Sequence, residues 1–375
     1  EPIESQGILN SLARNSTLKK IHPIVIAAIA AILADILLWL PLPREIHALL
    51  GSSWILWTAT GIGLWVVRDQ KPDSSRLLPA CGAGLGITAL SMFLLAAGQL
   101  WCDLYLWGFF LFLQLIALPR WAETIEHWRD SQQRTSPENP TKPPGRWNIL
   151  GGVALGACIL LPLFTLYYAL LPPVSFDALE YHLGVPWAWW QEGGMRFLPS
   201  LFYSNFPMYV EMLFTLAWRV GGETAIKVFH WQMGLLCASA IFIFLRRRVS
   251  RLGALLAALL FLASPQVIGL SISAKIGLGL TFFTLLALHH FMRWIRGNTG
   301  RDLWLCAVFC GLAAGCKYSA IGLLAAPLFV GVALQLFLSK KPTQIMLRQA
   351  SLFLLIIAAV FLPWAVKNLI YQGNP

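Results

Sequence analysis

Four stretches of the chain, 22–41, 148–171, 225–245 and 319–338, are almost continuously apolar and long enough to cross a lipid bilayer. A crossing helix needs about 20 apolar residues to span the hydrocarbon core. Because backbone polar groups in lipid must bond within the protein, only helices and closed barrels cross it. The runs lack the period-two alternation of barrel strands. With only 12% charged residues, where a soluble domain carries about 25%, the chain is predicted to be an all-α polytopic membrane protein.

About eleven transmembrane helices are expected, and basic residues gather on one side of them. With the topology below, 21 of the 28 Lys and Arg residues fall on that side, among them those of "RRRVSR" (246–251) and "RWIRGNTGR" (293–301). Cytoplasmic loops carry such an excess, so the N-terminus is predicted to be cytoplasmic. The expected spans are 22–41, 48–67, 77–98, 104–118, 148–171, 225–245, 252–272, 277–292, 303–316, 319–338 and 349–366.

This topology requires that segment 206–221, "FPMYVEMLFTLAWRVG", does not cross. The segment has only 16 residues and carries Glu211 and Arg219, and a charge at mid-membrane costs about 2.5–3.5 kcal/mol on insertion scales. We expect an amphipathic helix that rests on the outer interface. Residues 172–224 then form one long outer loop with interfacial helices.

A polar linker gives the only clear boundary. The stretch "RDSQQRTSPENPTKPPGR" (129–146) is rich in Pro, Ser and charge. We therefore expect an N-terminal four-span region (1–119), a cytoplasmic polar linker (120–147) and a membrane core (148–375). The first residue is Glu1 and the chain stops directly after its last span, which leaves open a processed start and a continuation beyond Pro375.

The outer loop opens with "SFDALEYHLGVPWAWWQEGG" (175–194), which gathers Asp177, Glu180 and His182 beside three tryptophans. Tryptophan favours the headgroup zone, as expected for this position. One interpretation makes Asp177 the N-cap of a helix and Glu180 its capping-box partner. The other makes Asp177 a general base at the mouth of a membrane cavity, with Glu180 on the same helix face to orient it. The two interpretations are compatible.

Four segments resemble the GT-C class of membrane glycosyltransferases, which includes the protein O-mannosyltransferases and the bacterial aminoarabinose transferases. The order and spacing of the segments agree with the layout of that class over about 148–375, and spans 1–4 lie outside the resemblance. The segments are "FDALEYHLGVP" after the first core span, "FPMYVEMLF", "GLAAGCKYSAIGLL" (311–324) and "PWAVKNLIYQGNP" (363–375).

The resemblance implies transfer of a sugar from a polyprenyl-phosphate donor to an acceptor on the non-cytoplasmic face of the membrane, here a bacterial inner membrane. An acid in the first outer loop serves as base in that class, and Asp177 is the matching position. Lys317 and Tyr318 match a "GxKY"-like motif, where a lysine holds the lipid phosphate as a point charge. His182, Glu211 and Arg219 are expected near the acceptor or the cavity. The expected partners are membrane lipid, the lipid-linked sugar and other membrane subunits.

One position departs from the pattern. Many members carry a second acid where the third core span turns into the fourth, but this turn reads "SISAKIGLG" (271–279), with Lys275 and no acid. Lys275 either pairs with Asp177, binds the donor phosphate, marks a loss of catalysis, or snorkels from a span end. A catalytically inactive GT-C-fold structural or assembly subunit therefore stays as the alternative. A transporter is a third hypothesis, and it is supported only by Asp35 inside the first span.

The remaining residues point to no further chemistry. His289 and His290 are expected to pack near an inner span end, and Asp35 to contact an adjacent helix or a partner subunit. Lys227 is a weaker phosphate candidate than Lys317. A divalent cation stays open as a cofactor, but neither the seven cysteines nor other residues show metal-ligand spacing. No nucleic-acid partner is expected, because the net charge of +11 lies in short loops between spans.

Overall fold

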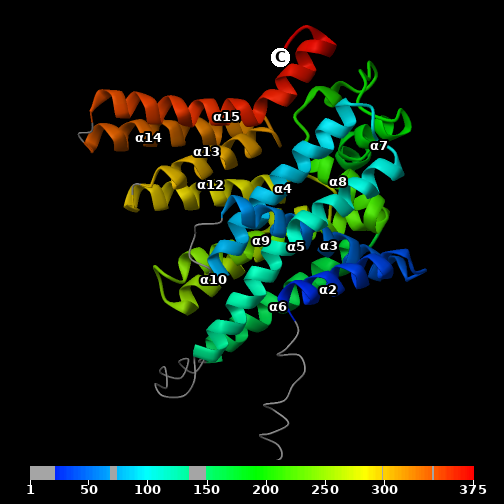
Figure 1. Ribbon diagram of the computed structural model, residues 1–375, viewed down its shortest axis with the longest axis horizontal. Coiled ribbons are helices and arrows are strands. Elements are labelled where there is room, and N and C mark those ends of the chain that lie inside the picture. Colours follow the sequence, from blue (N-terminus) through cyan, green and yellow to red (C-terminus); the bar gives the residue numbers. More distant parts are fainter. Residues whose placement is uncertain (1–21, 68–73, 135–148, 298, 340–341) are drawn as a thin grey trace, which may run out of the picture.

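The computed structural model describes residues 22–67, 74–134, 149–297, 299–339 and 342–375, which form helices and connections without any strand. Figure 1 shows α12, α13, α14 and α15 running side by side, with α2, α5 and α6 across the bundle from them. The helices are α2 (Pro23–Trp39), α3 (Arg44–Val66), α4 (Ser74–Ala97), α5 (Asp103–Arg134), α6 (Ile149–Ala169), α7 (Gly184–Gln191), α8 (Tyr209–Gly221), α9 (Glu223–Leu245), α10 (Arg251–Ala263), α11 (Pro265–Ser271), α12 (Gly277–Gly297), α13 (Gly300–Ala314), α14 (Ala326–Leu338) and α15 (Thr343–Gln372), with the short turns η2 (Ala178–His182), η3 (Phe202–Asn205) and η4 (Ile321–Ala325).

The all-α polytopic fold is confirmed, although fewer helices than eleven have the length of a span. Within the described ranges eight helices are long and apolar enough to cross a membrane, and nine if α10 and α11 count as one. These two meet at an angle of 65°, where Pro265 begins α11 and cannot donate the backbone hydrogen bond that would continue α10. The expected spans 22–41 and 303–316 appear as the shorter helices α2, with 17 residues, and α13, with 15.

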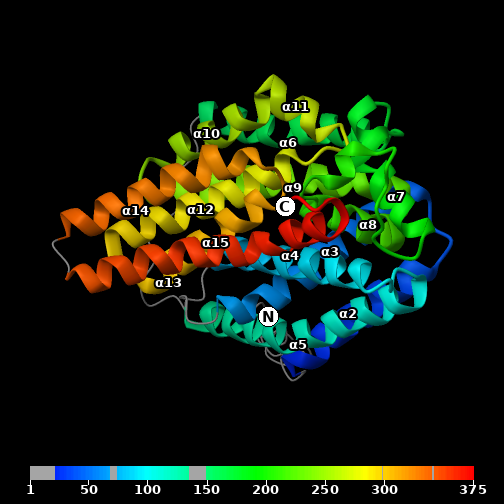
Figure 2. The ribbon, with the colours of Figure 1, turned by 90° about the horizontal axis from the view of Figure 1, so that it is seen from above.

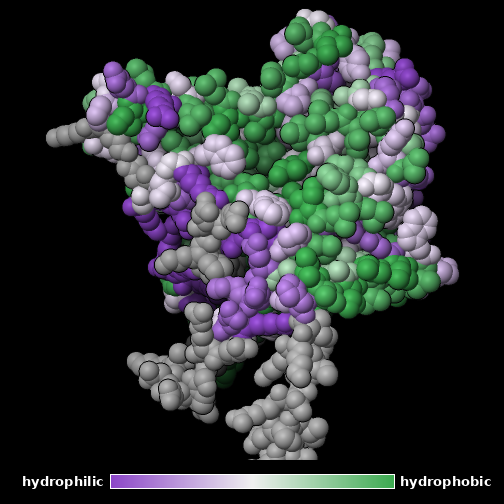
Figure 3. Space-filling view, viewed as in Figure 1, coloured by the Kyte–Doolittle hydropathy of each residue, from purple (hydrophilic) through white to green (hydrophobic). Residues whose placement is uncertain are grey.

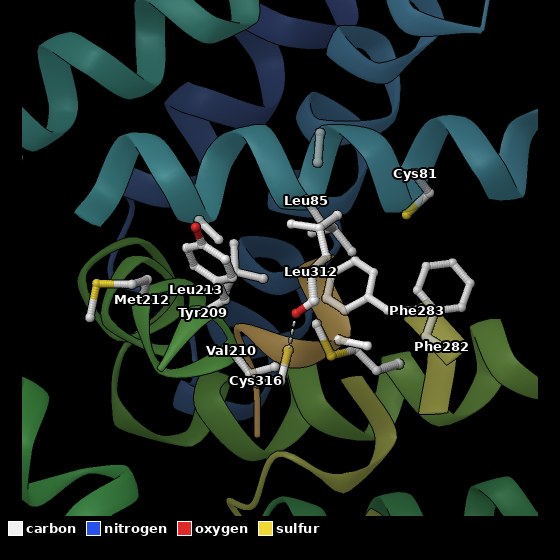
Figure 4. Close-up of a cluster of buried hydrophobic side chains, with 14 of the residues drawn as sticks. Cys81, Leu85, Tyr209, Val210, Met212, Leu213, Phe282, Phe283, Leu312 and Cys316 are labelled. Atoms are coloured by element: carbon white, nitrogen blue, oxygen red, sulfur yellow. Dashed lines mark hydrogen bonds between the residues drawn. The ribbon is translucent and has the colours of Figure 1, made fainter. Parts of the chain in front are cut away.

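Helix α8 is as short as the sequence predicts and lies at one end of the bundle, but it is packed inside the protein. Its 13 residues give a length of about 20 Å, less than the hydrocarbon thickness, so it does not cross. Its amphipathic face is not free, however, because all its residues except Trp218 and Arg219 are buried within the protein. It packs against α3, α4 and α9, and Figure 4 shows Tyr209 and Leu213 of α8 facing Leu85 of α4 and Leu312 of α13. The hydrophobic face of α8 therefore meets protein rather than lipid.

Close helix contacts join the N-terminal helices to one another and to the core. A Cβ on Gly84 of α4 would lie 1.6 Å from the carbonyl oxygen of Ala59 in α3, so only glycine permits this approach. Helix α3 in turn contacts α8 and α9. Helix α5 continues to Arg134, so the expected linker 120–147 begins within a helix; its remainder from residue 135 lies outside the described residues.

Asp35 of α2 bonds to two neighbouring helices. Its Oδ1 accepts hydrogen bonds of 3.0 Å from the indole N–H of Trp54 in α3 and from the amide of Gln114 in α5. The expected contact with an adjacent helix is confirmed. These bonds compensate for the partial burial of a carboxylate among apolar residues. They remove the one observation that supported the transporter hypothesis.

The connections of the bundle gather at two opposite ends. One end, called the loop end below, consists of residues 98–102, 170–222, 272–276 and 315–320 and the last two turns of α15. Hydrogen bonds join these segments, for example from the amide of Trp101 to the carbonyl of Gly193 and from the Tyr371 hydroxyl to the carbonyl of Met195. Figure 2 shows α7 and α8 at the right of the bundle, opposite the left ends of α12 and α14.

The opposite end, called the basic end below, is rich in arginine. On the face seen in Figure 3, hydrophobic residues cover the middle and hydrophilic residues gather toward the edges. The separation of loops into two ends agrees with the arrangement expected from the charge count. The basic end carries Arg246, Arg247, Arg248, Arg251, Arg293, Arg296 and Arg301 at the connections from α9 to α10 and from α12 to α13.

Candidate functional site

Asp177 and Lys275 form an ion pair at the loop end. Asp177 directly precedes η2, and Lys275 lies on the connection between α11 and α12. The ammonium of Lys275 donates to Oδ2 of Asp177 at 3.0 Å, and the side chains are 35% and 46% exposed for Lys275 and Asp177. Of the alternatives that the sequence left open for Lys275, the structure shows the pairing with Asp177.

The surroundings of Asp177 keep its carboxylate ionised. The hydrogen bond from Lys275 holds the pKa of Asp177 below its ordinary value. Partial burial opposes this effect, while the charges of Lys275, His182 and Lys317 add to it. The carboxylate at this position therefore accepts hydrogen bonds from a bound molecule over a wide pH range.

The expected capping box does not form. Asp177 has helical backbone angles and its side chain makes no capping hydrogen bond, because the carboxylate turns to Lys275. Oε2 of Glu180 is buried and has no hydrogen-bond partner in the described structure. Glu180 thus lies one turn from Asp177 as a second acid, without the role in helix capping that the sequence suggested.

His182 and Glu211 form a buried pair beneath this surface. Nδ1 of His182 lies 2.7 Å from Oε1 of Glu211, and the residues are 4% and 2% exposed. The ring of Tyr181 stacks on that of Tyr203 and contacts the His182 ring at a tilt of 44°. Burial, followed by the nearby carboxylates, raises the pKa of Tyr181 to about 12, so its hydroxyl stays protonated. Two residues 29 positions apart in the sequence are thus joined by the packing of η2 on α8.

Two cavities flank the cluster. One of about 400 Å³ lies between η2, α7, α8 and α9 and is lined by His182, Trp187, Trp218 and Glu223, among other residues. The other, of about 370 Å³, lies between α11 and the end of the α6 connection, and Lys275 forms part of its wall. Both combine mainly apolar walls with a few polar groups, which is usual for ligand sites.

Lys317 and Tyr318 lie on the connection between α13 and η4, also at the loop end. Lys317 is exposed and close enough to Asp177 to lower the pKa of that carboxyl. Tyr318 donates to the carbonyl of Asn205 at 3.4 Å, and partial burial raises its pKa. The connection is held at Gly315, where a Cβ would lie 2.1 Å from the Tyr209 ring.

Lys367 is a basic residue of this region that the sequence analysis missed. Its ammonium donates to the carbonyl of Ser204 and lies 5.5 Å and 5.6 Å from the ring centroids of Trp189 and Trp364, and the residue is 5% exposed. The neighbouring Asn368 donates to the carbonyl of Asn205. The end of α15 is therefore hydrogen-bonded to the loop at residues 204–205. A lysine in the apolar context "PWAVKN" was the available signal.

Two other basic candidates are engaged elsewhere. Arg219 binds both carboxylate oxygens of Asp103 and stacks on Trp190 at 4.6 Å, so it ties α8 to the start of α5. Lys227 donates to the carbonyls of Tyr168, Leu171 and Pro172 at 2.7–3.4 Å. It thereby supplies a donor to carbonyls at and just beyond the end of α6.

His289 and His290 lie away from this cluster, toward the basic end. Nδ1 of His290 bonds to Asp302 at 2.8 Å, and His289 stacks on Phe244, which confirms the expected packing. Across the residues that the structure describes, no group of three or more His, Cys, Asp or Glu side chains is arranged to hold a metal ion.

Residues 206–366 match the family model of dolichyl-phosphate-mannose-protein mannosyltransferases. The matched range contains Glu211, Lys275 and Lys317 and ends within α15, whereas Asp177 precedes it. The match confirms the resemblance to the GT-C class for this part of the chain. With the membrane-length helices it indicates an integral membrane protein of glycosyltransferase type. No curated protein and no solved structure was found to match the chain.

Proposed function

We propose that this protein transfers a sugar from a polyprenyl-phosphate donor to an acceptor at the loop end, with Asp177 as the base. The observation that carries the proposal is the carboxylate of Asp177, which is ionised, accessible and surrounded by Lys275 and Lys317 in a chain whose later part matches a glycosyltransferase family. An anionic base beside lysines suits a reaction in which a phosphate leaves.

In the proposed step, a hydroxyl or amine of the acceptor attacks C1 of the sugar. The bond between C1 and the phosphate oxygen breaks and its electron pair stays with the phosphate. The acceptor loses a proton, and Asp177 receives it. Lys317 neutralises charge on the departing phosphate. Tyr318 turns its hydroxyl hydrogen from the Asn205 carbonyl, 3.4 Å away, to the phosphate. Lys275, shared between Asp177 and the smaller cavity, orients the base and is the second candidate for contact with phosphate.

The cavity of about 400 Å³ is the proposed acceptor site. Nδ1 of His182 faces Glu211, which leaves Nε2 for a ligand in the cavity that His182 lines. Trp187 and Trp218 give the cavity aromatic walls. Glu180 is proposed to orient the acceptor beside Asp177. We assign Arg219 to anchoring this region, since Asp103 and Trp190 occupy its guanidinium.

We further propose that the loop end faces the non-cytoplasmic side of a bacterial inner membrane and that the N-terminus is cytoplasmic. The gathering of arginines at the basic end supports this orientation.

The test uses the purified protein in lipid vesicles that contain a polyprenyl-phosphate hexose. Wild-type protein is expected to release polyprenyl phosphate and to form a glycosylated product that mass spectrometry detects. Protein with Lys317→Ala is expected to need more donor for the same rate. If the wild type turns over none of a panel of lipid-linked sugars, glycosyl transfer is refuted.

One observation favours a second candidate function. Lys275 occupies the turn where many GT-C enzymes carry a second acid, and it neutralises Asp177. An inactive structural or assembly subunit of a membrane complex would retain the fold under such a change. Co-purification with a membrane partner, combined with absence of donor turnover, would favour this candidate.

A further inference from the structure

His230 of α9 bonds through both ring nitrogens to the connection between α11 and α12. Its Nδ1 lies 2.8 Å from the carbonyl oxygen of Ser273, and its Nε2 lies 3.0 Å from the amide nitrogen of Leu278. The side chain is fully buried, at 0% exposure. One imidazole from a different helix thus holds both sides of the short connection that carries Lys275.

These two bonds fix the protonation state of the ring. A carbonyl oxygen only accepts, so Nδ1 carries the hydrogen, and an amide N–H only donates, so Nε2 has a free lone pair. The imidazole is therefore neutral and has one tautomer. Leu278 is the second residue of α12, and the first amides of a helix have no acceptor within it. His230 supplies that acceptor from α9.

The connection fixed by His230 presents Lys275 to Asp177. Ser273 precedes Lys275 by two residues and Leu278 follows it by three, so little backbone between the two anchored points is free to rotate. The Lys275 ammonium then lies 3.0 Å from Asp177. Phe214 of α8 packs edge-on against the imidazole, with ring centroids 5.9 Å apart. The path from His230 to the carboxylate consists of backbone and one lysine side chain.

We propose that His230 is a positioning residue, which holds Lys275 against Asp177 without touching either Asp177 or a substrate. That this positioning matters for catalysis rests on the proposed function. That His230 holds Lys275 in place does not depend on it. The charged or titratable groups that face Asp177 include Lys275, Lys317 and His182, and also Tyr181. His182 is close to His230 as well. Of these, Lys275 is the one that His230 holds in place.

The first experiment measures how fast the Lys275 amine reacts with a soluble amine-reactive reagent. The folded protein is labelled in vesicles and then digested, and mass spectrometry quantifies the label on the peptide that contains Lys275. In the His230→Ala protein, Lys275 is expected to react about fivefold faster or more, as the loss of one net hydrogen bond would allow. The exposed Lys317 serves as the internal reference, and its rate is expected to stay the same. An unchanged rate at Lys275 would overturn the proposal.

His290→Ala is the matched control. His290 is also 0% exposed and bonded through Nδ1, but its partner is Asp302, in the first turn of α13. This variant loses a buried imidazole and is expected to leave the reactivity of Lys275 at the wild-type value. If His290→Ala accelerates Lys275 as much as His230→Ala does, the effect is general loosening and the positioning role is refuted.

Two conservative variants separate the bonds and protect the test against a failure of His230→Ala to fold. An asparagine amide reaches about as far as Nδ1 and retains the donor to Ser273, whereas a glutamine oxygen reaches about as far as Nε2 and retains the acceptor for Leu278. His230→Asn and His230→Gln are each expected to give Lys275 rates between wild type and His230→Ala. Rates in both that equal the wild type would contradict the proposal.

Transfer activity gives the second readout. Since pairing with Lys275 lowers the pKa of Asp177, its loss returns that pKa toward the ordinary value. Activity that needs the ionised carboxylate is then lost at a higher pH as the solution is acidified. The acid limb of the pH profile is expected to move upward in His230→Ala and to stay in place in His290→Ala. A wild type without transfer activity would refute the proposed function, while the Lys275 labelling would still decide the positioning role.

Discussion

At the scale of single residues, the ion pair of Asp177 and Lys275 determines what kind of base this site offers. Two neighbouring carboxylates raise the pKa of one of them, because like charges resist ionisation together. A lysine at 3.0 Å has the opposite effect and holds the pKa of Asp177 down. The carboxylate is therefore available at low pH, but it binds a proton less strongly. Its contribution then depends on placement of the acceptor as much as on basicity.

Replacing Lys275 tests this balance. In the Lys275→Met protein the pKa of Asp177 is expected to rise toward its ordinary value, because methionine retains the apolar stem and removes the charge. The activity that requires an ionised Asp177 is then lost at a higher pH during acidification. The measurement is transfer rate against pH, with wild type beside it. An acid limb that stays in place would show that Lys275 does not govern the base.

The site residues that could be predicted from the sequence lie in short motifs. The residues that contact them could not be predicted. "FDALEYHLGVP" indicated Asp177 and His182, but nothing in it distinguished a helix cap from a pair with Lys275, which is 98 residues away. His230 and Lys367 gave weak signals, since their partners are backbone carbonyls and amides brought near by packing. Polar residues inside apolar spans were the clue.

At the scale of elements, the positions of the helices in the sequence could be predicted, but which helices pack against one another could not. Each of the eleven expected spans falls on helical segments, because long apolar runs leave few alternatives. The span 252–272 is divided into α10 and α11, however, and only eight or nine of the described helices have the length of a span. The pattern of α8 fits both a membrane surface and a protein interior. The buried position of α8 is stable because Glu211 pairs with His182, which offsets the cost of burying that charge. The partly exposed Arg219 binds Asp103 at the edge of this contact.

Glycine substitutions test the contact between α3 and α4. Gly84→Ala would place a Cβ 1.6 Å from the Ala59 carbonyl oxygen, so the helices must separate. The expected loss of stability is about 1–3 kcal/mol, as for other overpacked interiors. Gly156→Ala in α6 is the control, since a Cβ there meets nothing within 4 Å. Thermal unfolding in detergent is the measurement, and equal stability of both variants would contradict this account of the contact.

At the scale of the whole molecule, the helices differ in burial and the two ends of the bundle differ in charge. The apolar windows of α6 and α15 are only 17% and 11% buried within the protein, whereas those of α3 and α4 are 61% and 67% buried. The apolar surfaces of α6 and α15 are thus left free to face lipid, while α3 and α4 pack at the centre. The loop end carries Asp177, Glu180 and Glu211, and the basic end carries the seven arginines named above. The proposed function and the proposed orientation therefore depend on the same division of charge.

The proposed orientation predicts which side of the membrane reacts with thiol reagents. Cys102, between α4 and α5 at the loop end, is exposed, whereas the other cysteines are buried or half-buried. A membrane-impermeant maleimide is expected to label intact cells that carry the wild-type protein and not those with Cys102→Ser. Labelling of Cys102 only after the membrane is permeabilised would reverse the orientation.

The most direct test of the central claim is sugar transfer by the Asp177→Asn protein. Asparagine has nearly the shape of aspartate but accepts no proton, and a positioned base contributes about 10²–10⁴-fold to a rate. The account predicts a loss of this size in reconstituted vesicles, with thermal unfolding unchanged and a smaller loss in Glu180→Gln. Transfer by Asp177→Asn at the wild-type rate would contradict the account, because the carboxylate at the loop end would then be no base.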